Sequence, residues 1–202
     1  MEGVSLAQLA AFVGVLSLAI LSPGPGIVAV SHAAFSMGRR AAMPYALGLA
    51  LGASVWCLVA LLGLTVLFET FPLFESAFHL AGGLYLLWIA WKLWSHAADP
   101  LPEPRGGARG LAAGMALNLS NPKPGLFYAS VLLFVFPDLS GFAASASVYA
   151  VALAVELVFY LGLAAILSAG AIRARYFAAK PWIDRGAAAL VALLGLLLIL
   201  RL

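Results

Sequence analysis

Charged residues are scarce in this sequence. Only 9% of its 202 residues carry a charge and 64% are apolar, whereas about one quarter of the residues in a soluble domain are charged. Residues 4–37 contain no Asp, Glu, Lys or Arg. A helix needs roughly 17–25 apolar residues to cross a hydrocarbon core about 30 Å thick. The composition therefore predicts an all-α integral membrane protein in a lipid bilayer, with no room for a soluble domain.

Residues that bind metals or carry redox chemistry are also scarce. Cys57 is the single cysteine, which excludes an internal disulfide, a CxxC redox pair and a thiolate metal cage. The histidines His32, His79 and His96 are scattered without the spacing of metal ligands. We predict no metal site, no cofactor and no enzyme activity. The net charge of +3 does not indicate nucleic-acid binding, because in a membrane protein the placement of the charges matters more than their sum.

The charge-poor stretches predict six membrane-spanning helices. They cover residues 6–36, 42–67, 76–94, 110–136, 142–170 and 185–202. Nine of the eleven basic residues lie in the loops after the first, third and fifth of these spans. The positive-inside rule places such loops in the cytoplasm. Both termini are therefore predicted to lie outside the cytoplasm.

A single Pro-rich hydrophilic segment lies near the middle of the chain. It falls in residues 99–108, which we interpret as a cytoplasmic linker. The linker separates a first repeat of three spans, residues 1–98, from a second repeat of three spans, residues 109–202. An odd number of spans per repeat makes the two repeats run in opposite directions through the membrane, as in transporters with inverted repeats.

The same five-residue pattern occurs in the first and the fourth span. Residues 22–26 read Ser-Pro-Gly-Pro-Gly and residues 121–125 read Asn-Pro-Lys-Pro-Gly, at an offset of 99. Ser or Asn followed by Pro is typical of a helix start. We predict that each span is broken into two half-helices, whose free N–H groups and positive dipole ends point at a site inside the membrane. The alternative is that these prolines and glycines only kink the spans.

Two ionisable residues are predicted to lie deep in the membrane. Lys123 is inside the second break, and Glu156 is near the middle of the fifth span. A charge at this depth costs at least about 2.5 kcal/mol on insertion scales, so it is usually paired, neutralised or turned toward a polar pathway. Three interpretations stay open: a structural salt bridge, a Glu156 carboxyl that couples transport to protons, and a pair that holds the two charged ends of a zwitterion.

Polar and small residues near the breaks are less decisive. Asn118 and Asn121 could donate hydrogen bonds to a substrate, although helix capping alone would explain Asn121. Gly48 and Gly52 match the GxxxG pattern of closely packed membrane helices. This packing could lie within one chain or between two chains, so a homodimer stays open.

Four stretches of the sequence resemble the LysE/RhtB family of bacterial amino-acid exporters. They are LSPGPGIVAVSHAAFSMGRRAAMPYALGLALG, AGGLYLLWIAWKLW, NLSNPKPGLFY and VELVFYLGLAAI. The resemblance covers nearly the whole chain. It implies a multi-pass protein of the bacterial inner membrane that exports small amino acids and is driven by the proton gradient.

The resemblance also implies roles for single residues. Pro23, Gly24 and Pro25 would form the first break, and Asn121, Pro122 and Lys123 the second. Glu156 would be the acidic position of the fifth span. The sequence departs from the family pattern at Gly26, where the family often has Asn or Asp, and this leaves the substrate class in doubt.

These observations predict a substrate site between the two breaks. Its residues are Pro23, Gly24, Pro25, Gly26, Asn118, Asn121, Pro122, Lys123 and Gly125, with Glu156 as the proton-coupling residue. The predicted function is export of small neutral amino acids, such as leucine, homoserine or threonine, by proton antiport with alternating access. Neutral cargo is favoured because Glu156 is the only acidic residue predicted to lie deep enough to meet a positive charge. The alternatives are an exporter of a basic amino acid or a metal cation, and a membrane scaffold or sensor that transports nothing.

Overall fold

All regular elements that the structure describes are helices. The computed structural model describes residues 4–22, 25–70, 75–99 and 110–200. The helices are α1 (Leu6–Leu21), α2 (Pro25–Met37), α3 (Arg39–Thr70), α4 (Glu75–Ser95), α5 (Gly110–Leu119), α6 (Pro122–Val135), α7 (Phe142–Ile166), α8 (Gly170–Ala178) and α9 (Lys180–Ile199). The prediction of an all-α fold is confirmed for these residues.

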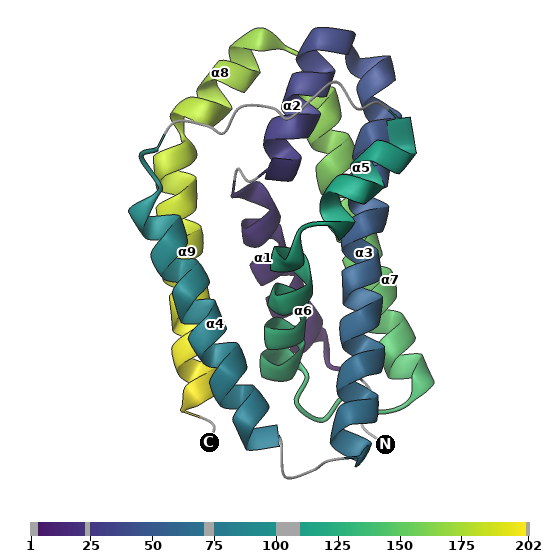
Figure 1. Cartoon of the computed structure of the whole chain (residues 1–202), viewed down its shortest axis with the longest axis vertical. Coiled ribbons are helices and arrows are strands. Elements are labelled where there is room, and N and C mark those ends of the chain that lie inside the picture. Colours follow the sequence, from purple (N-terminus) through teal and green to yellow (C-terminus); the bar gives the residue numbers. More distant parts are fainter. Residues whose placement is uncertain (1–3, 23–24, 71–74, 100–109, 201–202) are drawn as a thin grey trace.

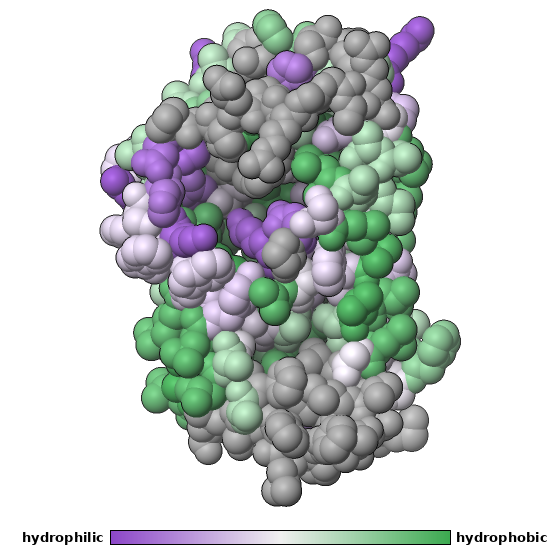
Figure 2. Space-filling model, in the orientation of Figure 1, coloured by the Kyte–Doolittle hydropathy of each residue, from purple (hydrophilic) through white to green (hydrophobic). Residues whose placement is uncertain are grey.

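Several of these helices are long and apolar enough to cross a membrane. By length and composition, residues 39–63 of α3, the whole of α7 and the whole of α9 qualify, and α1 with α2 would form a fourth, bent span. Large apolar side chains such as Leu62 and Val158 are exposed on the helix surfaces, as expected where lipid replaces water. Figure 2 shows hydrophobic side chains over much of the lower part of one face, with hydrophilic ones gathered above them. The six-span arrangement stays a prediction.

The structure differs from the predicted spans near the last loop. The ninth helix begins at Lys180 rather than at residue 185, and α8 lies in a stretch that was expected to be a loop. Pro181 stands in the first turn of α9, where a proline costs no hydrogen bond. An ion pair of 3.0 Å between Lys180 and Asp184 joins residues one turn apart and supports the same turn.

Glycines bring the helices together in two close pairs. A Cβ atom on Gly48 would overlap the carbonyl oxygen of Leu111, and one on Gly114 would overlap that of Tyr45, so α3 and α5 meet backbone to backbone. In the same way, a Cβ on Gly195 of α9 would lie 2.8 Å from the carbonyl oxygen of Gly83 in α4. The GxxxG glycine Gly48 therefore packs within one chain.

The central helices lie between these two pairs. In Figure 1, α4 and α9 stand on one side, α3, α5 and α7 stand on the other, and α1 and α6 run between them. The amino end of α6 and the carboxyl end of α1 both fall near the middle of the molecule. The fold thus brings the two predicted breaks, 99 residues apart in the sequence, to the same level.

Candidate functional site

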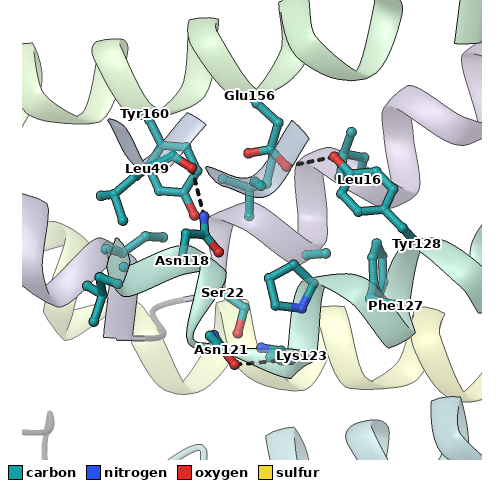
Figure 3. Close-up of a pocket in the computed structure, with 17 residues that line it drawn as sticks. Leu16, Ser22, Leu49, Asn118, Asn121, Lys123, Phe127, Tyr128, Glu156 and Tyr160 are labelled. Carbon is teal, nitrogen blue, oxygen red and sulfur yellow. Dashed lines mark hydrogen bonds between the residues drawn. The ribbon is translucent and has the colours of Figure 1, made fainter. Parts of the chain in front are cut away.

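A small pocket lies between the carboxyl end of α1 and the amino end of α6 (Figure 3). Its free volume is about 90 Å³. It is lined by Leu16, Ala19, Ile20, Ser22, Gly26, Ile27, Leu49, Ala53, Leu117, Asn118, Asn121, Lys123, Pro124, Phe127, Tyr128, Glu156 and Tyr160. Most of these side chains are apolar, so the few polar groups decide what the pocket can bind.

The structure brings five of the predicted site residues into this pocket: Gly26, Asn118, Asn121, Lys123 and Glu156. Pro23 and Gly24 lie outside the described residues, as do the side chains of Pro25 and Pro122. Gly125 is described but does not line the pocket. A Cβ on Gly125 would overlap the indole ring of Trp56, so this glycine serves the packing of α6 against α3.

The Glu156 carboxylate supplies an unpartnered acceptor. The side chain is only 2% exposed. Its Oε1 accepts a hydrogen bond of 2.7 Å from the Tyr128 hydroxyl, whereas its Oε2 is buried without a hydrogen-bond partner among the described residues. Nearly all buried polar groups in folded proteins are paired, so a free carboxylate oxygen beside a pocket indicates a place for a bound proton or a cationic group.

Lys123 lies on the other side of the pocket. Figure 3 shows Glu156 reaching in from α7 and Lys123 at the opposite edge, at the start of α6. Within the described part of the chain, the ion pair that forms is the one between Lys180 and Asp184, not one between Lys123 and Glu156. The interpretation of Lys123 and Glu156 as a structural salt bridge therefore finds no support here.

The backbone at the start of α6 has no free N–H group among those described below. The side-chain oxygen of Asn121 accepts a hydrogen bond of 3.1 Å from the N–H of Lys123. The N–H of Asn121 donates to the carbonyl oxygen of Asn118, and Pro122 and Pro124 have no N–H group. The structure thus differs from the expectation of free N–H groups at this break. The positive end of the helix dipole and the Lys123 side chain remain to attract an anion.

Asn118 is held by neighbouring helices rather than pointing freely into the pocket. Its side-chain amide donates a hydrogen bond of 2.8 Å to the carbonyl oxygen of Leu49 in α3. The indole N–H of Trp56, also in α3, donates to the backbone oxygen of Asn118 at 3.2 Å. The bond to Leu49 gives the buried Asn118 side chain a partner, and the bond from Trp56 adds to the one that the Asn118 backbone oxygen already accepts from Asn121.

Gly26 leaves room for a tyrosine from α7. A Cβ on Gly26 would lie 3.2 Å from the hydroxyl oxygen of Tyr160. Tyr160 lines the pocket, and it follows Glu156 by four residues, so both side chains lie on the same face of α7. The small residue at position 26 and the tyrosine at position 160 therefore share one wall of the pocket.

Sequence reasoning missed several polar groups of this region. The four-residue spacing from Glu156 could have indicated Tyr160, whereas nothing in the sequence indicates that Tyr128 would meet Glu156. The structure also buries a second carboxylate, that of Asp184, which is 4% exposed. Sequence reasoning did not indicate this burial, because Asp184 lies just before the predicted sixth span. Asp184 is, however, already paired with Lys180.

Comparison with known proteins shows which family the chain belongs to. Residues 17–202 match the family described as LysE type translocator. The chain belongs to this family. The resemblance seen in the four stretches of sequence is thereby confirmed, and the family is one of transporters rather than enzymes.

Several bacterial relatives are named for the amino acid that they export. The chain is 32% identical to the "Threonine efflux protein" of Salmonella typhi over 191 residues, which cover 91% of this chain and 93% of the relative. The threonine efflux protein of Escherichia coli K12 is 31% identical with the same coverage. The "Leucine efflux protein" of Enterobacter sp. strain 638 is 29% identical over 180 residues, with 87% of this chain and 85% of the relative covered. No solved structure matches the chain.

Proposed function

We propose that this protein exports small neutral amino acids across a bacterial inner membrane. The observation that carries the proposal is a pocket with the Lys123 ammonium group on one side and the unpartnered Oε2 of Glu156 on the other. An amino acid is a zwitterion whose two charged groups complement these two. The threonine and leucine efflux proteins among the relatives support the same cargo class.

The two ends of the pocket would hold the two ends of the cargo. The carboxylate of the amino acid would bind near Lys123, where the positive end of the α6 dipole adds to the attraction. Its ammonium group would bind Oε2 of Glu156. The apolar lining, which includes Leu16, Ile27 and Phe127, then accepts a small side chain. A free volume of about 90 Å³ is well below the roughly 300–1,000 Å³ of sites for drug-sized ligands, which favours a small cargo.

Glu156 would also couple export to the proton gradient. A proton and the ammonium group of the cargo compete for the same carboxylate, because Tyr128 already occupies its other oxygen. A carrier that holds either one but not both must exchange them across the membrane. Ionisable residues inside membrane proteins often serve as such proton relays.

Alternating access would come from the two halves of the chain. In this proposal residues 1–98 and 109–202 form inverted three-span repeats joined by the linker 99–108, and both termini lie outside the cytoplasm. The pocket takes its lining from α1, α2 and α3 of the first half and from α5, α6 and α7 of the second. A site at the contact of two repeats is the usual place for a transported substrate.

Uptake into inside-out vesicles tests this function. Labelled amino-acid mixtures are offered with and without a lumen-acidic pH gradient. We expect gradient-driven accumulation, which identifies the cargo, and we expect Glu156→Gln to lose most of it. Asp138→Asn, which changes an exposed carboxylate away from the pocket, is the matched control and should transport like the native protein.

Each component of the proposal can fail separately. If no amino acid accumulates above the level in empty vesicles, the protein does not export amino acids, and metal cations and other small solutes are tested next. If amino acids accumulate and Glu156→Gln keeps the full response to the pH gradient, the cargo class stands and the coupling role of Glu156 is refuted.

A further inference from the structure

A buried polar network lies at the carboxyl end of α1, next to the pocket. We call it the Asp184 network, and it consists of Ser22, Tyr176, Lys180 and Asp184. The Ser22 hydroxyl donates a hydrogen bond of 2.6 Å to Oδ1 of Asp184, and the Lys180 ammonium group lies 3.0 Å from Oδ2. Ser22, Lys180 and Asp184 are all buried. Each oxygen of the Asp184 carboxylate thus has its own partner, Ser22 at the end of α1 and Lys180 in α9.

The network extends to two further elements. The Tyr176 hydroxyl of α8 donates a hydrogen bond of 2.6 Å to the carbonyl oxygen of Leu21, the last residue of α1. The Lys180 ammonium group donates to the carbonyl oxygens of His96 and Ala97, directly after α4, at 3.0 and 2.9 Å. One buried cluster therefore joins the end of α1 to α8, to α9 and to the end of α4.

One residue links this network to the pocket. Ser22 lines the pocket, and its hydroxyl is bonded to Asp184. A buried ion pair is by itself weak evidence for stability, because desolvation of the two charges offsets most of their attraction.

We infer that Asp184 is a positioning residue of the transport cycle. Its carboxylate holds the end of α1 against α9 in the state that the structure describes, and the Ser22–Asp184 hydrogen bond breaks when the end of α1 moves during the cycle. This inference rests on the proposed function to the extent that it requires alternating access. A bond that exists in one of two states biases the equilibrium between them, and its removal shifts their populations.

Thiol labelling from either side of the membrane measures these populations. Cys57 is buried and is replaced first by Cys57→Ala, so that the reagent meets no other thiol. The reporter is Ala53→Cys, because Ala53 lies on α3 and lines the pocket. A membrane-impermeant thiol reagent then labels the reporter in inside-out and in right-side-out vesicles, and the ratio of the two rates reports which side the pocket faces.

Two variants break the network and one matched variant leaves it intact. Asp184→Asn removes the charge, and Ser22→Ala removes the hydroxyl that bonds to it. Ser31→Ala is the control, because Ser31 is an equally buried serine of the adjacent α2 whose hydroxyl donates to the carbonyl oxygen of Ile27 in its own helix. We expect Asp184→Asn and Ser22→Ala to change the labelling ratio by about threefold or more, and Ser31→Ala to leave it unchanged.

The result separates a positioning role from a structural one. Lower thermal stability in the two network variants with an unchanged labelling ratio would show that the network only holds the fold, and the inference would be wrong. Equal shifts in Ser31→Ala would overturn it as well. If Asp184→Asn does not fold, Ser22→Ala decides alone. Labelling needs no cargo, so a failed search for a transported amino acid would refute the proposed function without changing this result.

Discussion

The two breaks carry the same sequence pattern but are held in different ways. At the second break, α6 begins at Pro122 and is capped by its immediate neighbour Asn121. At the first, α1 ends at Leu21, and the groups there are bonded by Tyr176 and Asp184, more than 150 residues away. The start of α6 is thus capped by its own neighbour, whereas the end of α1, like the end of α5 with its bonds to Leu49 and Trp56, is held by distant parts of the chain.

The largest expected effect comes from removing the distant support of the first break. Asp184→Ala leaves the buried Lys180 ammonium group without its counter-ion, and loss of one partner of a buried ion pair typically costs about 3–5 kcal/mol. We expect a strong loss of folded protein on heating in detergent. The double variant Asp184→Leu with Lys180→Met removes both charges and should recover most of the stability. If the single variant were as stable as the native protein, the first break would not depend on this pair.

Both copies of the five-residue pattern end in a glycine, Gly26 and Gly125. We expect substitutions of these glycines to have effects of intermediate size. Gly125→Ala places a Cβ into the ring of Trp56, and overpacking of this kind costs about 1–3 kcal/mol. In Gly26→Ala the tightest contact of the new Cβ is with the Tyr160 hydroxyl, at 3.2 Å, while Leu49 lies at an ordinary 3.6 Å, and the tyrosine side chain can move. We expect Gly125→Ala to lower the unfolding temperature clearly, and Gly26→Ala to act mainly on substrate affinity. Equal losses of stability would mean that the glycines of the two breaks are equivalent.

The smallest effect concerns one hydrogen bond at the first break. Tyr176→Phe removes the bond to Leu21 and should cost about 0.5–1.5 kcal/mol. Burial, together with the charge of Asp184, raises the pKa of Tyr176 above its ordinary value of 10.0. Because a tyrosine is protonated below its pKa, its hydroxyl remains a donor throughout the neutral range. The stability difference between Tyr176→Phe and the native protein should therefore be constant from pH 6 to pH 9 when thermal unfolding is measured. A difference that vanished within this range would contradict the raised pKa.

Local sequence determined the helices and the class of protein. The scarcity of charge in residues 4–37 predicted membrane helices, and the step from Asn121 to Pro122 marks the point where α6 begins. These features depend on hydrophobicity and on the backbone preferences of a few neighbouring residues, so they can be read without knowing the fold. The same local stretches also carried the resemblance to the LysE family, which the match over residues 17–202 confirmed.

Only the tertiary structure decided which polar groups meet. It bonds Glu156 to Tyr128, 28 residues away, and Ser22 to Asp184, 162 residues away, while Lys123 and Glu156 line the same pocket without an ion pair between them. It also turned Gly125 toward Trp56 instead of the pocket. Hydrophobic and charge patterns show that a residue is at membrane depth, but not which neighbour it faces. Which side chains face one another depends on how the helices pack. Close backbone contacts at glycines such as Gly48 and Gly195 set this packing.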